Sequence, residues 1–245
     1  MSQEKKVALI TGANRGIGLE TAKQLGAEGV TVVVGARQQG AAEETAATLR
    51  AAGVDAYGVK LDVVREEDRK ATAKYIADKF GKLDILINNA GVAADTGFAP
   101  VNSQTSDSEL ARVFETNLFA VVALTRELLP LIKKAPAGRI VNLSSILGSN
   151  TLHADPNSPI AGSKSFAYDA SKAALNSYTI HLAWELKDTP IKVNSAHPGW
   201  VKTEMGSEAA PMEIPEGAKT SVALATLGAD GPSGRFIHLG SELPW

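Results

Sequence analysis

Near its start the chain reads Val7-Ala8-Leu9-Ile10-Thr11-Gly12-Ala13-Asn14-Arg15-Gly16-Ile17-Gly18. Residues 7–10 have the length and β-branched content of a strand buried on both faces, and residues 19–28 have helical composition. The three glycines therefore fall at a strand-to-helix turn, where they let the backbone approach a pyrophosphate. The free N–H groups and positive dipole of the helix start stabilise its negative charge. The stretch predicts a nucleotide site at the end of the first strand.

The spacing of these glycines is G-x-x-x-G-x-G, not G-x-G-x-x-G. A glycine-rich turn alone is as compatible with a tight loop as with a phosphate site, but the preceding strand and following helix are the context that a phosphate site requires. No Gly-Lys-Ser or Gly-Lys-Thr follows, which disfavours a P-loop of the kinase or NTPase type.

The end of the next predicted strand, residues 31–36, indicates which dinucleotide fits. In dinucleotide folds an acid about 20 residues past the glycines binds the ribose 2′-OH of NAD, whereas an arginine accommodates the 2′-phosphate of NADP. Ala36 and Arg37 stand there, with no acid. Arg15 offers a second cation, since guanidinium matches phosphate with paired donors. We predict NADPH/NADP+, against the alternative that both arginines are solvated surface charges.

Tyr168 and Lys172 stand four residues apart in an Ala-rich segment, residues 165–186, that reads as a helix. One helical turn puts both side chains on the same face. A nearby cation favours phenolate, so Lys172 is expected to lower the pKa of Tyr168 from its ordinary value near 10. This would make Tyr168 a usable proton donor and acceptor, although the spacing alone is common by chance.

The order of the predicted elements specifies the fold class. Strands beginning near residues 7, 31, 56, 83, 139, 191 and 235 alternate with helices beginning near residues 16, 41, 66, 107, 165 and 215. Such alternation predicts an α/β doubly wound (Rossmann) fold, with a mostly parallel seven-stranded sheet and helices on both faces, as a single domain over residues 1–245. Ser106 and Glu109 fit a capping box that starts the long helix carrying Asn117.

Several motifs in the same order identify the chain as a member of the short-chain dehydrogenase/reductase family, in its compact, carbonyl-reductase-like branch. The resemblance runs from Val7 to about Leu239. Besides the glycine turn and the Tyr168/Lys172 pair, it rests on these residues: Asn88-Asn89-Ala90-Gly91 after an apolar strand, Asn117, Ser145, Asp62 after the third strand, and Pro198-Gly199 after the sixth.

The resemblance implies a catalytic tetrad of Asn117, Ser145, Tyr168 and Lys172. Ser145, at a strand end, would hydrogen-bond the substrate carbonyl, and Tyr168 would protonate its oxygen as hydride reaches the carbon. Lys172 would lower the Tyr168 pKa and hold the nicotinamide ribose, and Asn117 would hold a water that relays protons to Lys172. Ser144 competes with Ser145 for the serine position, and only one of the two should face the site.

The resemblance also implies a set of cofactor contacts. They come from Gly12, Asn14, Arg15, Gly16, Ile17, Gly18, Arg37, Asp62, Val63, Asn89, Ala90, Gly91, Tyr168, Lys172, Pro198, Gly199, Val201 and Thr203. Asp62 would take the adenine amino group; the alternative is an acid that merely ends a strand. The substrate would contact Ser145 and Tyr168, and Trp200 is a candidate wall of the pocket, though core packing explains a tryptophan there equally well.

The chain departs from the compact family pattern between Ser145 and Tyr168, which lie 23 positions apart where about a dozen is usual. We infer an insertion over residues 149–164, rich in turn residues. It either walls the substrate pocket or covers a helix face used for assembly, so we expect a monomer or a dimer. His153 within it is expected to be an exposed loop residue rather than a substrate contact. Residues 205–215 are expected to form a mobile lid.

Composition limits the other possibilities. With 44% hydrophobic residues, 21% charged residues and a net charge of −2 among 245 residues, nothing suggests a nucleic-acid site or disorder. There is no cysteine, which excludes disulfides and thiolate ligands. The four histidines have no ligand spacing, so no metal is expected. No leader-like stretch precedes the first strand and no apolar run reaches membrane-spanning length, which predicts a cytoplasmic location without a membrane partner.

Together these features predict an NADPH-dependent carbonyl reductase that acts on a small-molecule ketone or aldehyde. One alternative is an NADP-dependent alcohol dehydrogenase that uses the same site for oxidation. The other is a non-catalytic NADP(H)-binding sensor.

Overall fold

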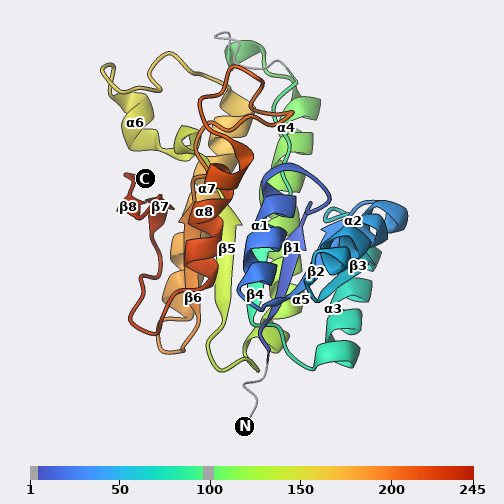
Figure 1. The fold of residues 1–245 in the computed structure, drawn as a ribbon. Helices are drawn as coiled ribbons and strands as arrows, with labels where there is room; N and C mark the ends of the chain where they lie inside the picture. The colour runs from blue at the N-terminus through green and yellow to red at the C-terminus, as the bar shows by residue number, and fades with distance from the viewer. Residues whose placement is uncertain (1–4, 96–101) are drawn as a thin grey trace.

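The computed structural model describes residues 5–95 and 102–245. Residues 1–4, which belong to the start that was expected to lack a leader, lie outside the described residues. An eight-stranded sheet in the order β3-β2-β1-β4-β5-β6-β7-β8 forms its centre (Figure 1). The strands are β1 Val7–Thr11, β2 Thr31–Ala36, β3 Ala56–Lys60, β4 Ile85–Asn88, β5 Arg139–Leu143, β6 Lys192–Ala196, β7 Phe236–His238 and β8 Ser241–Glu242. All neighbouring pairs are parallel except β7 and β8.

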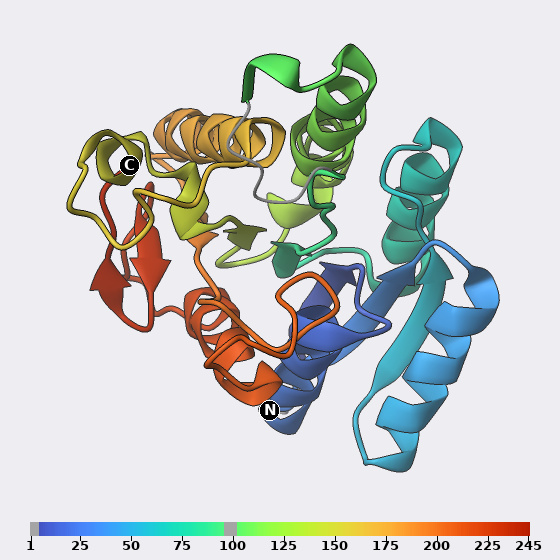
Figure 2. The ribbon, with the colours of Figure 1, turned by 90° about the horizontal axis from the view of Figure 1, so that it is seen from above.

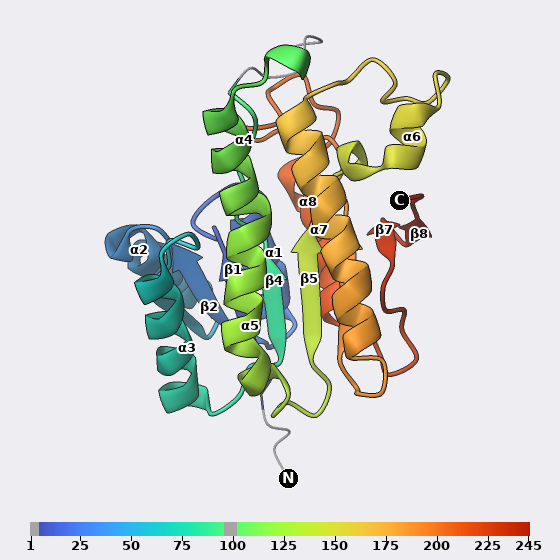
Figure 3. The ribbon, with the colours of Figure 1, turned by 180° about the vertical axis from the view of Figure 1, so that it is seen from behind.

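Helices cover both faces of this sheet, as Figure 2 shows from above. They are α1 Gly16–Ala27, α2 Gln39–Ala51, α3 Glu66–Phe80, α4 Asp107–Phe114, α5 Ala120–Ile132, α6 Asn150–Ala154, α7 Phe166–Glu185 and α8 Ile214–Ala225. On one face α1, α2 and α8 pack over the strands, and on the other α3, α5 and α7 do so (Figure 3). The predicted doubly wound fold is confirmed.

Each face of the sheet has its own apolar core, which explains the uninterrupted apolar run of β1. Leu9 packs into the core under α3, α5 and α7. Ala8 and Ile10 point to the opposite face and pack under α1, α2 and α8. Side chains alternate between faces along a strand, so a central strand covered on both sides needs an apolar residue at every position.

Two local features differ from the sequence prediction. The sheet has an eighth strand, β8, whose residues Ser241 and Glu242 have no strand composition and pair with β7 through a tight antiparallel turn. The predicted long helix is divided by a π-helical turn, η2 Glu115–Phe119, between α4 and α5. Its start is as predicted, because Ser106 Oγ accepts a hydrogen bond from the Glu109 amide at 3.2 Å.

The insertion contains regular structure where only loop was expected. A 3₁₀ turn, η3 Ile146–Gly148, leads into α6, and Ser149 caps α6 by accepting from the Leu152 amide at 3.1 Å. The Thr151 amide donates to the carbonyl of Trp245 at 2.9 Å, so α6 lies beside the end of the chain (Figures 1 and 2). The outer faces of α5 and α7 are not covered by it (Figure 3).

The carboxyl ends of the seven parallel strands meet at one edge of the sheet, the upper edge in Figure 1. The loops after β1, β4, β5 and β6 all open there. In doubly wound folds ligands bind outside this edge. The topology therefore brings the predicted site segments together from distant parts of the sequence.

Gly58 of β3 tests the packing of α2 on the sheet. A Cβ atom at this position would lie 2.6 Å from the backbone C and O atoms of Ala42 and the backbone N of Glu43. Backbone atoms of a packed helix cannot yield, so Gly58→Ala should lower the free energy of unfolding by about 1–3 kcal/mol. Urea denaturation measures this change.

Gly40 is the matched control for this substitution because it lies in α2 itself with no atom within 4 Å of an added Cβ. Gly40→Ala should leave stability unchanged or raise it slightly through helix propensity. Equal effects of the two substitutions would contradict the packing argument.

Candidate active site

The glycine turn between β1 and α1 has the conformation that its sequence predicts. Gly12 and Gly16 have positive φ angles of 62° and 57°. A Cβ on Gly18 would lie 2.5 Å from Asn89 Nδ2 and 2.6 Å from the Gly12 carbonyl oxygen. The first two glycines are thus required by backbone conformation and the third by close approach of α1 to the strand ends.

Thr11 and Asn89 fix this turn to the end of β4. The Thr11 hydroxyl accepts hydrogen bonds from the amides of Asn89 (3.0 Å) and Ala90 (2.9 Å). Asn89 Nδ2 donates to the carbonyls of Thr11 (2.8 Å) and Gly12 (3.1 Å). Sequence reasoning gave Thr11 no role of its own, although its place directly after the apolar run is the signal that could have found it.

The start of α1 is suited to an anion. Arg15 is the N-cap residue, and no side chain caps the helix, so the first-turn N–H groups have no side-chain acceptor. Asn14 and Arg15 are exposed, and Ile17 is partly buried. Such an end can hold a pyrophosphate.

The two predicted phosphate-binding arginines differ in their surroundings. Arg37, directly after β2, is exposed and forms no hydrogen bond or ion pair within residues 5–95 and 102–245. Arg15 Nη1 forms an ion pair with Glu204 Oε2, and both side chains are largely exposed. Glu204 was not singled out from the sequence. Its contact depends on how residues 203–213 fold back over the glycine turn, which no local motif encodes.

Asp62 and Val63 follow β3 at the same edge of the sheet. Asp62 is partly exposed, and its Oδ1 accepts from the Val64 amide at 3.3 Å. Its own amide donates to Asp68 Oδ2 at 3.0 Å, which fixes the turn into α3. Val63 is buried. The Asp62 carboxylate therefore keeps one oxygen without a partner among the described residues.

Ser145, Tyr168 and Lys172 come together at the ends of β5 and α7. Ser145 Oγ accepts from the Leu147 amide at 3.2 Å, and the Ser145 side chain lies near enough to Tyr168 to lower the pKa of the phenol. Lys172 Nζ lies 5.6 Å from the centroid of the Tyr168 ring. It donates to the carbonyl of Leu143 at 2.7 Å, and the residue is only 5% exposed.

The expectation that Lys172 lowers the Tyr168 pKa is wrong. Burial raises the pKa of Tyr168 to about 12, and the nearby Ser145 side chain opposes this rise. Burial also lowers the pKa of Lys172 to about 8. Desolvation disfavours the charged form of either group, and it is the largest cause of both shifts. At neutral pH the phenol therefore keeps its proton.

The structure distinguishes the two serines at the end of β5. The Ser144 amide donates to the carbonyl of Ala196 at 2.8 Å, whereas its buried hydroxyl has no partner among the described residues. The hydroxyl of Ser145 faces Tyr168 instead. Successive side chains at the end of a strand point to opposite sides, so Ser145 is the serine placed beside the phenol.

Asn117 is fully buried in the π-helical turn η2. Its Oδ1 accepts from the Val92 amide at 2.8 Å, and its Nδ2 donates to the Val92 carbonyl and to Ser171 Oγ, both at 3.0 Å. These bonds tie η2 to α7 and to the segment after β4. They use both amide protons of the Asn117 side chain. The role of Asn117 in holding a water stays a prediction.

Gly91 belongs to this cluster as well. A Cβ there would lie 3.3 Å from Asn117 Oδ1 and 3.6 Å from Lys172 Nζ. The predicted Asn-Asn-Ala-Gly segment thus reaches the same point as the tetrad residues.

The segment after β6 closes on itself above the glycine turn. Gly199 has a positive φ of 93°, and buried Val201 forms an isolated bridge with Met212. Trp200 is 55% exposed, and its Nε1 donates to the Gly206 carbonyl at 2.6 Å. Thr203 Cγ2 is the nearest atom, at 3.8 Å, to a Cβ built on Gly16. The substrate contact of Trp200 and the mobility of this loop stay predictions; Pro198 and Gly199 are partly buried.

Two histidines differ from their sequence interpretation. His153 is not an exposed loop residue: its side chain is 15% exposed and contacts Asp169 of α7. His197 directly precedes Pro198-Gly199, and sequence reasoning gave it no role. Its Nδ1 accepts from the Ile146 amide at 3.2 Å, and burial lowers its pKa to about 3. Neutral His197 therefore holds the backbone directly after Ser145.

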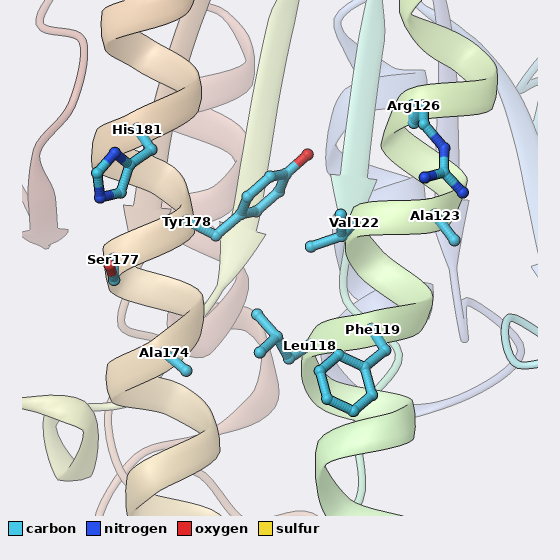
Figure 4. Close-up of a pocket in the computed structure, with 9 residues that line it drawn as sticks. All are labelled: Leu118, Phe119, Val122, Ala123, Arg126, Ala174, Ser177, Tyr178 and His181. Atoms are coloured by element: carbon cyan, nitrogen blue, oxygen red, sulfur yellow. The ribbon is translucent and has the colours of Figure 1, made fainter.

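A separate apolar groove lies between α5 and α7 (Figure 4). Leu118, Val122, Ala174 and Tyr178 are among its lining residues, and Arg126 and His181 lie at its rim. It occupies the outer sides of the helices, and none of the predicted site residues lines it.

A glycine turn at a bare helix start, a buried serine and lysine and a partly buried tyrosine, all at the carboxyl edge of one doubly wound sheet, define a Rossmann-fold oxidoreductase. Residues 6–214 match the family model described as short chain dehydrogenase. The chain belongs to the short-chain dehydrogenase/reductase family, as its motifs predicted.

Relatives within this family include reductases of carbonyl groups. The chain is 36% identical to a 3-oxoacyl-[acyl-carrier-protein] reductase of Pseudomonas aeruginosa over 85% of this chain and 78% of that protein. The crystal structure of NADPH-bound carbonyl reductase from chicken fatty liver is similar with a TM-score of 0.85 and 28% identity, covering 99% and 100% of the two chains. Salutaridine reductase from Papaver somniferum gives a TM-score of 0.81 and 30% identity, covering 95% and 99%.

Two kinds of feature are absent from residues 5–95 and 102–245. In that part of the chain no helix is long and apolar enough to cross a membrane. No group of three or more potential metal-ligating side chains was found there either.

Lys172 should cost stability at neutral pH. Because its folded-state pKa of about 8 lies below the ordinary 10.5, the unfolded chain binds the proton more tightly. Stability therefore rises with pH between these values, and charged Lys172 costs roughly 3 kcal/mol below pH 8. Lys172→Met removes this cost but loses the bond to Leu143, so we expect a net gain of about 1–2 kcal/mol at pH 7. Urea denaturation at pH 7 and 9.5 measures it.

The gain should shrink at pH 9.5, where Lys172 of the unsubstituted protein is largely neutral when folded. Exposed Lys219 of α8 is the control, and Lys219→Met should change stability little at either pH. A Lys172→Met protein less stable than the unsubstituted one at pH 7 would show that burial of this ammonium is not a cost.

Proposed function

We propose that the chain is an NADPH-dependent carbonyl reductase that reduces a ketone or aldehyde with Tyr168 as proton donor. The observation that carries the proposal is the meeting of the Tyr168 phenol with Ser145 and Lys172 at the sheet edge where the glycine turn opens. The names of the similar proteins, a ketoacyl-type reductase and a carbonyl reductase, support a C=O substrate.

The bare start of α1 and the glycine cradle fit a dinucleotide. The residues that would hold it are Gly12, Asn14, Arg15, Gly16, Ile17, Gly18, Arg37, Asp62, Val63, Asn89, Ala90, Gly91, Tyr168, Lys172, Pro198, Gly199, Val201 and Thr203. A bound nicotinamide supplies the hydride. The absence of an acid after β2 and the unpartnered Arg37 support NADP(H) over NAD(H), as does NADPH in a similar carbonyl reductase.

Tyr168 holds the proton that the reduction consumes. With a pKa of about 12, the phenol stays protonated in neutral solution, and Ser145 lies where it can hold the substrate oxygen beside it. The O–H bond of Tyr168 breaks as hydride reaches the carbonyl carbon, and the proton goes to the forming alkoxide. Lys172, protonated below its pKa of about 8, then stabilises the phenolate left behind.

This arrangement favours reduction over the two alternatives. Alcohol oxidation needs Tyr168 without its proton, which burial opposes. A sensor without turnover would not need a serine, a tyrosine and a lysine brought together beside the glycine turn. We further propose that residues 1–245 act as one domain on a small molecule without nucleic acid; cytoplasmic location and a monomer or dimer stay predictions.

Tyr168→Phe tests the proton donor. The substitution removes one hydroxyl and should lower kcat for ketone reduction by about 10²–10⁴-fold, because general acid catalysis contributes that much. NADPH fluorescence should report a dissociation constant raised by no more than about tenfold, the effect of losing one hydrogen bond to the cofactor. NADPH consumption over a panel of cyclic and linear ketones measures the rate, and NADH in place of NADPH tests the cofactor choice.

Unchanged consumption in Tyr168→Phe would end the acid-base assignment. Tight NADPH binding by the unsubstituted protein with no turnover of any ketone would support the sensor instead. Tyr75, on α3 away from this edge, is the control, and Tyr75→Phe should leave kcat within about twofold of the original value.

Glu204→Gln tests the phosphate-binding role of Arg15. A 2′-phosphate that binds Arg15 must displace Glu204 from its ion pair. Exposed ion pairs contribute up to about 1 kcal/mol, so the substitution should tighten NADP+ binding by up to about fivefold at low salt and leave NAD+ binding unchanged. Isothermal titration calorimetry measures both constants.

Glu208 is an exposed acid of the same loop, and Glu208→Gln is the matched control. The gain from Glu204→Gln should fade at high salt, where exposed charges are screened. An equal change for NAD+ and NADP+ would exclude competition for the phosphate.

A further inference from the structure

The insertion reaches the proposed catalytic residues through a buried polar cluster. In α6, the Nδ1 atom of His153 lies 3.0 Å from Lys164 Nζ. Its Nε2 atom lies 2.9 Å from the Leu147 carbonyl oxygen. The same Nε2 lies 3.3 Å from Asp169 Oδ2, and the two side chains are only 15% and 11% exposed. Lys164 also donates to the His153 carbonyl at 3.0 Å.

The partners of His153 determine where its proton lies. The Lys164 ammonium can only donate, so Nδ1 is the acceptor. Nε2 therefore carries the ring proton and donates to the carbonyl of Leu147, with the Asp169 carboxylate as a longer second acceptor. Each nitrogen of the imidazole therefore has a partner.

This single ring joins the two segments that carry the proposed catalytic pair. Leu147 lies two residues after Ser145, and its amide donates to Ser145 Oγ at 3.2 Å. Asp169 follows Tyr168, and its Oδ2 also accepts from the Ser165 amide at 2.9 Å, which anchors the start of α7. His153 therefore contacts the backbone behind Ser145 and the carboxylate behind Tyr168.

The packing between these segments leaves little room for relaxation. A Cβ on Gly148 would lie 2.8 Å from the backbone carbon of Lys172. The 3₁₀ turn η3 therefore lies directly on the turn of α7 that follows Tyr168. A small shift of η3 would change the distance between the Ser145 and Tyr168 hydroxyls, and misplacement of about 1 Å can cost about 10²-fold in rate.

We propose that His153 is a positioning residue of the reductase: it holds Ser145 in place beside Tyr168 by bridging the Leu147 carbonyl and Asp169. The inference rests on the proposed function and gives the insertion a role in it. The charged groups in contact with this ring are Lys164 from the insertion and Asp169 from α7.

Two substitutions separate the hydrogen bonds of His153 from its volume. His153→Leu fills the space without a donor, and His153→Gln offers an N–H near the position of Nε2. We expect His153→Leu to lower kcat by about 10–100-fold with an unchanged NADPH dissociation constant, and His153→Gln to recover most of the loss. His181, exposed on the outer side of α7, gives the matched control, and His181→Leu should leave kcat unchanged.

Amide hydrogen exchange gives a readout that does not need turnover. Loss of the bridge should speed exchange in peptides covering residues 144–149 and 165–170 by about tenfold in His153→Leu, with no change in His181→Leu. These peptides contain the Leu147 and Ser165 amides that the cluster holds. Exchange accelerated equally over the whole chain would indicate general destabilisation and overturn the proposal.

The inference also fails if kcat of His153→Leu stays within twofold of the original value, or if His153→Gln is as impaired as His153→Leu. Tyr168→Phe, assayed in parallel, separates this failure from that of the proposed function. An active Tyr168→Phe protein refutes the proton donor, whereas an inactive one with an unimpaired His153→Leu protein refutes only the positioning role. If the unsubstituted protein reduces no ketone, the amide exchange rates alone test whether His153 bridges the two segments.

Discussion

Desolvation of Tyr168 and Lys172 is the constraint on which the rest of the site depends. Burial shifts both groups toward their neutral forms, raising one pKa to about 12 and lowering the other to about 8. The charged lysine is therefore held in the fold at a cost, which the two apolar cores offset. In the proposed function the same burial suits the phenol to its role, because it keeps the proton available and strengthens any charge interaction that appears during reaction.

Such a pair needs rigid surroundings, and buried polar side chains bonded to backbone provide them. Thr11 and Asn89 join the ends of β1 and β4, and Asn117 joins the π-helical turn to Val92. Neutral His197 holds the amide after Ser145. Each satisfies backbone groups that would otherwise be unpaired near the strand ends, where ladder bonds stop. The open edge of the sheet is thereby as well fixed as its interior.

The sequence predicted what local pattern and strand topology determine. The apolar run of β1, the glycine turn and the alternation of elements were sufficient for the sheet, and helical spacing put Tyr168 beside Lys172. It could not predict the direction in which the Tyr168 pKa shifts, because the spacing of charged residues is visible in a sequence and desolvation is not. His153 was misread for a similar reason: a loop composition says nothing of a carboxylate on α7 that receives the side chain. Strand β8 has only 2 residues, too few to show the alternation that predicts a strand.

Two segments outside the strands reach the site, and they reach different parts of it. Residues 203–213 contact the glycine turn through Glu204 and Arg15, so they act where a cofactor phosphate would lie. The insertion contacts Leu147 and Asp169 through His153, so it acts where the proton is held. Because neither contact involves the reacting hydroxyls themselves, each segment can alter binding or alignment without altering the chemistry. A doubly wound scaffold with a fixed proton donor can in this way vary its cofactor preference and its substrate pocket separately.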